Sequence, residues 1–236
     1  MRPWRRGAAL AWVTVVLFAA GCAGKTEGPG ADEGGERSTV PAAADKVLEQ
    51  QELQQAMVTQ KDLPGHTFDA LPGPAWADNA PVTPAVCRPV NAAVGLASPA
   101  KPKALVKQVM SAVAGDYGGS MALASYAPDQ AREVIAALRT ALRSCTAFTP
   151  AYGFAYEDVV ALPDPGLGSE SVSYRLLQVV SSDAEKSVKV PVTVIVVRQG
   201  AIVATFQSAN IRRDGPAVVP PDVVSKQLTK LAEMAS

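Results

Sequence analysis

Between residues 128 and 145 the chain has its clearest helical spacing of apolar residues, in PDQAREVIAALRTALRSC. The apolar side chains recur every three or four positions, as they do on one face of an α-helix. They are Ala131, Val134, Ile135, Leu138, Leu142 and Cys145. The charged side chains lie off this stripe, so we predict an amphipathic helix that directs Cys145 into the core.

After Cys145, apolar residues recur at every second position, which is typical of β-strands. In residues 188–198 alternate valines form one face, while Lys189 and Thr193 stand on the other. We predict strands over residues 153–162, 170–181, 188–198 and 201–209. The last helical stripe covers residues 221–234.

The connection between the last two strands determines their register. A three-residue loop, Arg198-Gln199-Gly200, would pair Val196 with Ile202 and keep one face of the hairpin apolar. A two-residue turn at Gln199-Gly200 would pair Val196 with Val203 and mix the faces. We therefore predict the three-residue loop.

The pattern in the N-terminal half predicts mainly short helices. We predict a helix over residues 45–57 that packs at the rim of the core, with Asp45 as its N-cap. Further predicted elements are a strand over 66–71, an irregular segment over 72–90, helices over 90–97 and 103–114, and a strand over 120–126. Helices mixed with mostly antiparallel strands indicate an α+β fold, with the β-sheet packed against helices.

Residues 1–21 have the order of an export signal: three arginines, an apolar run, then small residues before Cys22. The run of about 13 residues is shorter than the roughly 20 needed to span a bilayer. Ala19-Ala20-Gly21-Cys22 resembles a bacterial lipobox, although Ala19 stands where that pattern usually has Leu. We expect Cys22 to be the lipidation site and acyl chains such as palmitate to hold the protein at the membrane. The alternative is an ordinary secretory signal with an incidental Cys22.

Except for Val40, residues 22–44 contain no large aliphatic or aromatic side chain. We therefore predict a flexible tether, and a short ordered strap is the alternative. Residues 45–236 then form a single domain that is long enough for its own core. With Cys22 lipidated, Cys87 and Cys145 are left in an oxidising compartment, where we expect them to form a disulfide. Two buried free thiols or a metal pair are the alternatives.

The 22 basic residues balance the 22 acidic ones, and removing the three arginines of residues 1–21 leaves a net charge of −3. No basic excess is available to bind phosphates, so we expect no nucleic-acid partner. His66 is the only histidine, so any Ser-His-Asp or Cys-His catalytic arrangement would have to use it. We expect His66 to be a solvated side chain, and we expect no metal, no cofactor and no enzymatic activity. A hydrolase whose carboxylates come together from distant positions is a lesser alternative.

The aromatic residues are the remaining candidates for a site. Tyr152, Phe154 and Tyr156 alternate on one predicted strand, Tyr174 and Phe206 lie on neighbouring strands, and Trp76 lies in the irregular segment. The simpler interpretation is a sheet core beneath helices. The alternative is an apolar cleft between sheet and helix that binds a lipid or another hydrophobic small molecule.

The segment SYAPDQAREVIAALRTALRSC, together with Val86-Cys87-Arg88-Pro89-Val90 and Leu63-Pro64-Gly65, resembles the PknH-like extracellular sensor domain family of actinobacterial kinases and lipoproteins. The resemblance covers roughly residues 60–235 and implies an antiparallel sheet with helices, a cleft for an unidentified ligand, and no catalytic residues. Two departures are plain. Residues 174–200 lack the second cysteine pair that members often carry, and these 236 residues include no kinase domain.

These patterns together predict a lipid-anchored protein on the extracytoplasmic face of the cell membrane, with a non-catalytic ligand-binding or sensing domain. Its expected partners are the membrane and either a hydrophobic small molecule or another cell-envelope protein. A structural cell-envelope protein that binds no small ligand is the alternative.

Overall fold

The computed structural model describes residues 45–71, 81–97, 100–113, 118–181 and 187–235. All of them belong to one compact unit, Arg37–Ser236. Residues 1–44 and Trp76 lie outside the described residues, so the predicted signal, lipidation site and tether stay predictions. None of the helices in the described ranges has the length and apolar character needed to cross a bilayer.

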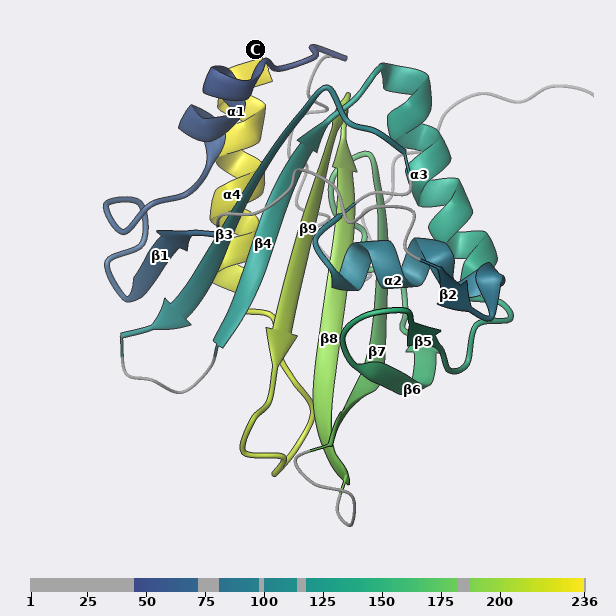
Figure 1. The fold of residues 1–236 in the computed structure, drawn as a ribbon. Coiled ribbons are helices and arrows are strands. Elements are labelled where there is room, and N and C mark those ends of the chain that lie inside the picture. Colours follow the sequence, from purple (N-terminus) through teal and green to yellow (C-terminus); the bar gives the residue numbers. More distant parts are fainter. Residues whose placement is uncertain (1–44, 72–80, 98–99, 114–117, 182–186, 236) are drawn as a thin grey trace, which may run out of the picture. The chain divides into compact units, whose positions relative to one another are not determined.

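A seven-stranded sheet forms the centre of this unit, in the order β1-β3-β4-β9-β8-β7-β6 (Figure 1). Its members in chain order are β1 (His66–Ala70), β3 (Ala104–Ala112), β4 (Gly118–Ser125), β6 (Ala155–Ala161), β7 (Glu170–Ser181), β8 (Ser187–Gln199) and β9 (Ile202–Ala209). Neighbouring strands are antiparallel throughout. The predicted α+β class with an antiparallel sheet is therefore confirmed.

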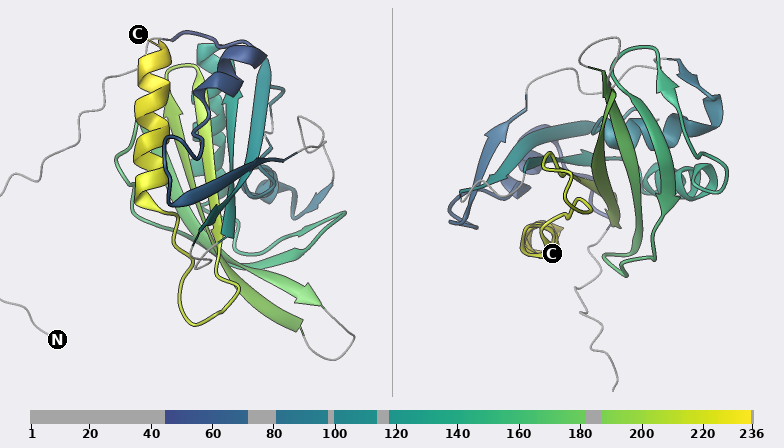
Figure 2. Two further views of the ribbon diagram at one scale, coloured as in Figure 1. Left: turned by 90° about the vertical axis from the view of Figure 1, so that its left-hand side faces the viewer. Right: turned by 90° about the horizontal axis from the view of Figure 1, so that it is seen from below.

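Helices cover the sheet from both sides (Figure 2). They are α1 (Gln50–Ala56), α2 (Arg88–Val94), α3 (Pro128–Ala141) and α4 (Pro221–Ala235). The α2 and α3 side also carries a short 3-10 turn, η1 (Ala85–Cys87), and a small two-stranded sheet of β2 (Val82–Thr83) and β5 (Thr149–Pro150). α1 and α4 lie on the opposite face.

Two apolar cores result, one on each face of the sheet. Along β8, Val194 and Val196 belong to the core under α2 and α3. Val197, the next residue along the strand, belongs to the core under α1 and α4, and Ile195, between the two valines, packs against that same core. A strand that is buried on both faces is apolar almost continuously, which explains the run of valines in β8.

The register of the β8–β9 hairpin differs from our prediction. Val196 lies opposite Thr205 and Gln199 opposite Ile202, which leaves a two-residue turn at Gly200-Ala201. Gly200 has a φ of 60°, a conformation that favours glycine in such turns. The prediction assumed one apolar face, whereas Ile202 and Phe206 pack into the second core on the other face.

The predicted helix over residues 103–114 is wrong, because this segment contains strand β3 between β1 and β4. Met110 faces the core under α1 and α4, whereas Leu105 faces the other core. Apolar residues on both faces of a strand imitate a helical stripe. The buried Gln108, whose side chain donates a hydrogen bond to the Val58 carbonyl at 3.2 Å, further hides the alternation.

The first helix is shorter and deeper than predicted. α1 begins after Glu49, whose backbone N–H donates to the Glu52 carboxylate at 2.9 Å, so Asp45 is not the N-cap. Leu53 and Ala56 are fully buried, which corrects the expected position at the rim. The predicted helix over residues 90–97 is observed as α2, and the remaining predicted strands and the helices α3 and α4 are confirmed.

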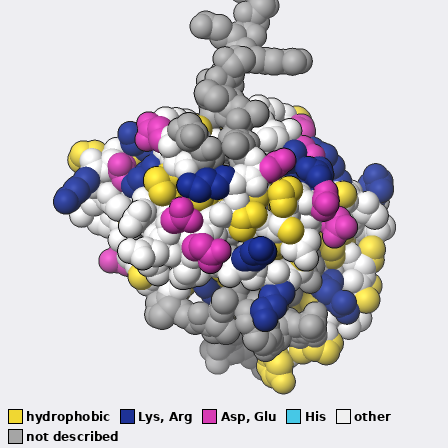
Figure 3. All heavy atoms as spheres, turned by 90° about the horizontal axis from the view of Figure 1, so that it is seen from above, with side chains coloured by type: hydrophobic (Ala, Val, Ile, Leu, Met, Phe, Trp, Pro, Cys, Tyr) yellow, Lys and Arg dark blue, Asp and Glu magenta, His cyan; other side chains and the backbone are white. Residues whose placement is uncertain are grey.

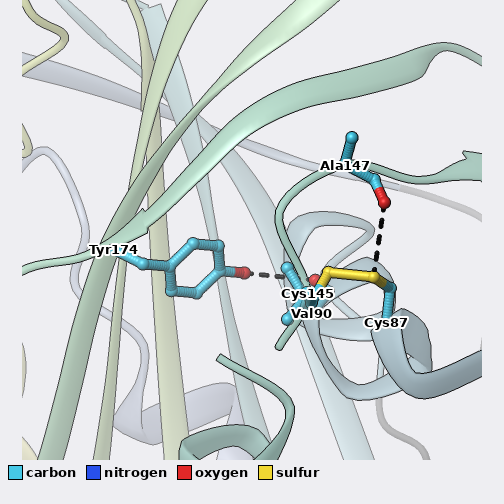
Figure 4. Close-up of a disulfide and its surroundings, with 5 residues drawn as sticks. All are labelled: Cys87, Val90, Cys145, Ala147 and Tyr174. Atoms are coloured by element: carbon cyan, nitrogen blue, oxygen red, sulfur yellow. Dashed lines mark hydrogen bonds between the residues drawn. A yellow bond between two sulfur atoms is a disulfide. The ribbon is translucent and has the colours of Figure 1, made fainter. Parts of the chain in front are cut away.

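A disulfide between Cys87 and Cys145 joins the start of α2 to the turn after α3, with an S–S distance of 2.09 Å (Figure 4). Both cysteines are buried. The Cys87 sulfur also lies 3.5 Å from the Ala147 carbonyl oxygen, a contact without a shared proton because the bonded sulfur carries none. The predicted pairing is confirmed.

Replacing both cysteines by alanine should lower the free energy of unfolding by about 4 kcal/mol, since the bond closes a loop with a sequence separation of 58 residues. Urea unfolding of the full chain measures this loss. Cys22→Ser serves as the control, and we expect it to leave the unfolding free energy of residues 45–236 unchanged. Equal midpoints for the wild type and the double variant would contradict the expectation.

Polar contacts attach α4 to the end of α1. The fully buried Gln227 side chain donates to the Ala56 carbonyl at 2.7 Å and accepts from the Val58 N–H at 3.0 Å. Nearby, the Lys230 ammonium lies 2.9 Å from the Asp62 carboxylate. Burial alone would raise the pKa of Asp62, but hydrogen bonds from Lys230 and Thr59 outweigh burial and hold this pKa below its ordinary value.

Because its folded-state pKa is lowered, Asp62 stabilises the fold above its unfolded pKa of about 3.9, and this stability is lost as pH falls through the folded value. Asp62→Asn should therefore cost about 1 kcal/mol at pH 7 and progressively less below pH ~4. Thermal unfolding of both proteins between pH 2 and 8 tests this. A cost that stays constant over that range would rule out the ionic contribution.

Candidate functional site

The structure separates the aromatic residues that the sequence suggested for a site. Tyr174 is fully buried on the α2 and α3 side of the sheet, and its hydroxyl donates to the Val90 carbonyl at 3.1 Å (Figure 4). Burial raises the pKa of Tyr174 well above its usual range, with a smaller contribution from Tyr156, so the hydroxyl keeps its proton. Phe206 is fully buried in the core on the opposite face. These two rings cannot line one cleft.

The remaining described aromatic candidates, Tyr152, Phe154 and Tyr156, lie near the start of β6. Tyr156 stacks on Phe148 with ring centroids 4.8 Å apart. Tyr152 and Phe154 precede β6 instead of alternating along it, and their exposed fractions are 85% and 44%. No shared aromatic site forms among the described candidates, and any ligand role of these residues stays a prediction.

The space beneath α3, where the sequence suggested a possible apolar cleft, is nearly filled. A cavity of about 20 Å³ is left between helices and sheet, bordered by residues such as Tyr126, Leu138 and Val203. Such a volume holds about one water molecule. The region under α2 and α3 is therefore a core, as the simpler interpretation of the sequence had it.

A larger groove of about 490 Å³ lies beside β6, β7 and β8, and its volume is within the range of small-molecule pockets. Its borders are supplied by the three strands and by the connection from β9 to α4. The lining residues are Asp158, Val160, Arg175, Leu176, Leu177, Pro191, Val192, Thr193, Gly215, Pro216 and Ala217.

The floor of the groove is the sheet face on the α4 side. Arg175 on β7 lies between Val160 on β6 and Thr193 on β8, and Leu177 and Pro191 form the next pair. The adjacent residues Tyr174 and Leu176 belong to the core on the opposite face. The period of two along β7 therefore places Arg175 and Leu177 on the groove side.

An irregularity in the edge strand forms one wall. The pairing of β6 with β7 shifts between Glu157 and Val160, and Asp158 has a φ of 51°, which is uncommon for a residue other than glycine. Val159 is buried in the core on the α2 and α3 side, and its N–H donates to the Thr146 carbonyl at 2.9 Å. Bulges of this kind redirect side chains next to binding sites, and here Asp158 borders the groove.

The β9–α4 connection forms the opposite wall, and hydrogen bonds hold it in place. The Thr193 hydroxyl donates to the Ala217 carbonyl at 2.7 Å. The Asn210 amide donates to Asp214 and to the Gly215 carbonyl, and its backbone N–H donates to Pro191 on β8. The bond from Asn210 is also the main reason that the pKa of Asp214 is lowered. The wall is therefore preformed.

Some charged side chains at the groove form ion pairs, and others do not. Glu157 lies across from the groove residue Leu177, and its carboxylate lies 2.6 Å from the Lys189 ammonium. The hydrogen bond and charge of Glu157, with a further contribution from Asp158, raise the pKa of Lys189. Arg175 is exposed, and among the described residues it forms no ion pair.

Outside the groove, two carboxylates, those of Asp164 and Glu170, lie near the same arginine at the end of α3. Arg139 lies 3.6 Å from Asp164 and 3.4 Å from Glu170, and Glu170 also lies 3.2 Å from Arg198. A pocket of about 190 Å³ borders Asp164 and Arg139. Both carboxylates are neutralised by arginines, as in a structural ion-pair network that attaches α3 to the start of β7.

His66 is not the solvated side chain that the sequence suggested. It begins β1, is mostly buried, stacks on Phe68 at 6.1 Å, and lies 3.5 Å from the Asp222 carboxylate.

Within the described ranges, no three His, Cys, Asp or Glu residues gather as a metal site. Seen from above, basic and acidic side chains are interspersed among the described residues of this face (Figure 3).

No protein-family model matches the sequence, and no curated protein matches it. Among solved structures, the chain is similar to the extracellular domain of PknH from Mycobacterium tuberculosis, with a TM-score of 0.48 and 10% sequence identity. The match covers 81% of this chain and 98% of that chain. At this identity and TM-score the match does not establish membership of a family, so the functional argument depends on the groove itself.

Thr193→Val should loosen the wall of the groove, because it removes the hydroxyl that holds Ala217 without changing side-chain size. We expect a loss of about 1 kcal/mol in unfolding free energy and faster hydrogen exchange at residues 214–217. Thr229→Val is the matched control, since the Thr229 hydroxyl bonds only within α4. Unchanged exchange at residues 214–217 in Thr193→Val would show that this bond does not order the wall.

Proposed function

We propose that the chain is a lipid-anchored, extracytoplasmic binding protein, and that its groove beside β6, β7 and β8 binds a small molecule without chemical conversion. The observation that carries this proposal is the groove of about 490 Å³, with a preformed wall and, on its floor, an arginine that forms no ion pair with any described residue. Small-molecule sites combine apolar borders with a few placed polar groups in the same way.

The proposed location is supported by independent features of the chain. The Cys87–Cys145 bond is of a kind that persists in oxidising compartments. The charged, apolar and small residues before Cys22 have the order of an export signal with a lipobox. Acylation of Cys22 would place the binding domain at the outer face of the cytoplasmic membrane, on a tether of about two dozen residues.

A non-catalytic role is part of the proposal. Among the described residues that border the groove, one carries a carboxylate, Asp158, and none is a histidine or a cysteine. The close carboxylates at the end of α3, Asp164 and Glu170, are bound by arginines. The competing proposal is a structural cell-envelope protein that acts through surface contacts with another protein.

Mass spectrometry of the full chain extracted from membranes should find acyl chains on Cys22. The Cys22→Ser variant should be exported without them and should be recovered from the soluble fraction. Soluble, unmodified wild-type protein would contradict the anchor.

Native mass spectrometry of the same extract tests the binding role. We expect a retained small-molecule mass that is lost when Val160→Asp places a charge on the groove wall. Val109→Asp is the matched control, because Val109 is similarly exposed on β3, far from the groove in strand order. A retained mass that both variants keep would place binding elsewhere, and ligand-free wild-type protein would favour the structural alternative.

A further inference from the structure

The chemistry of the groove restricts what can occupy it, if the proposed binding role holds. Arg175 lies on β7, which has neighbours on both sides, so its guanidinium rises from the floor and not from an edge. In contrast, Arg139 and Arg198 each bind a carboxylate. A guanidinium presents a planar set of donors that matches a carboxylate or phosphate group. Arg175 has this capacity unused among the described residues.

Around Arg175 the surfaces are mainly apolar. Val160 lies directly across from it on β6, and Leu177 with Pro191 form the next pair along the floor. Pro216 and Ala217 form the facing wall. An occupant therefore needs an apolar body that covers these side chains while one end reaches the guanidinium.

Two acidic groups also lie at this end of the sheet. They influence the charge of the preferred ligand less strongly than Arg175 does. Glu157 is bound to Lys189 at 2.6 Å. Asp158 acts on the same ammonium, since its charge contributes to the raised pKa of Lys189. Both carboxylates are thus opposed by a nearby cation, whereas Arg175 forms no ion pair within the described ranges.

We propose that the groove binds an anionic amphiphile: a molecule with one carboxylate or phosphate that pairs with Arg175 and an apolar body that lies on Val160, Leu177 and the Pro216-Ala217 wall. This inference rests on the proposed binding role and adds the class of ligand. The charge-assisted pair fixes the orientation, and burial of the apolar body supplies most of the affinity.

Three probes with the same apolar body and different charge test the ligand class: octanoate, 1-octanol and octylammonium. They are titrated into the full chain carrying Cys22→Ser, so that no acyl chain of the anchor competes for the groove. Amide shifts in nuclear magnetic resonance report both the affinity and the location. We expect octanoate to bind most tightly, with shifts in β7, β8 and residues 214–217.

Arg175→Gln should weaken octanoate binding roughly ten-fold and leave 1-octanol unchanged, while Arg175→Lys should restore part of the loss. Arg132→Gln is the matched control, because it makes the same charge change on α3, beside the opposite face of the sheet. Val160→Asp should weaken binding of octanoate and 1-octanol, since it places a carboxylate on the apolar wall of the groove.

Other outcomes would overturn one or both proposals. Equal affinity for octanoate and 1-octanol, insensitive to Arg175→Gln but abolished by Val160→Asp, would leave the groove as a binding site and overturn the anionic class. Tighter binding of octylammonium would also overturn it and assign the charge recognition to Asp158. Absence of binding by every probe to the wild-type groove would overturn both the ligand class and the binding role.

Discussion

Burial of the central strands on both faces is the constraint on which the rest of this structure depends. β8 and β9 contribute Val196 and Val203 to the core beneath α2 and α3, and Val197 and Phe206 to the core beneath α1 and α4. Any shift of one residue in the β8–β9 register would exchange these two sets of side chains between cores of different shape. The two-residue turn at Gly200-Ala201 is the connection that keeps each set on its own face.

On one side, the disulfide and a buried hydroxyl complete the attachment of the helices. Cys87–Cys145 links α2 to the end of α3, and the nearby Tyr174 hydroxyl reaches from β7 to the Val90 carbonyl in α2 (Figure 4). An aromatic residue that the sequence offered as a ligand contact thus has a structural role. The dense packing leaves about 20 Å³ beneath α3, so ligand binding in that core would require the helices to move.

On the other side, the cover is incomplete, and that is where the groove lies. The core under α1 and α4 draws its strand residues from β3, β4, β8 and β9, such as Met110, Leu123 and Phe206. Arg175 and Val160, on β7 and β6, are exposed on the same face. The bulge at Asp158 and the connection held by Thr193 and Asn210 border this uncovered part of the sheet. A binding site arises where the second helical layer stops short of the edge of the sheet.

The sequence by itself determined the elements whose periodicity was unambiguous. The stripe of α3, the strands after Cys145 and the pairing of the two cysteines in the described chain follow from local spacing and from cysteine number. Tertiary structure decided β3, because Leu105 and Met110 face different cores and together imitate a helix. It also decided the hairpin register, since a pattern along one strand does not reveal that both faces are covered. The groove escaped sequence reasoning for the same reason: Arg175, Asp158 and Pro216 are far apart in the chain, and only the sheet order and the path of the β9–α4 connection bring them to one place.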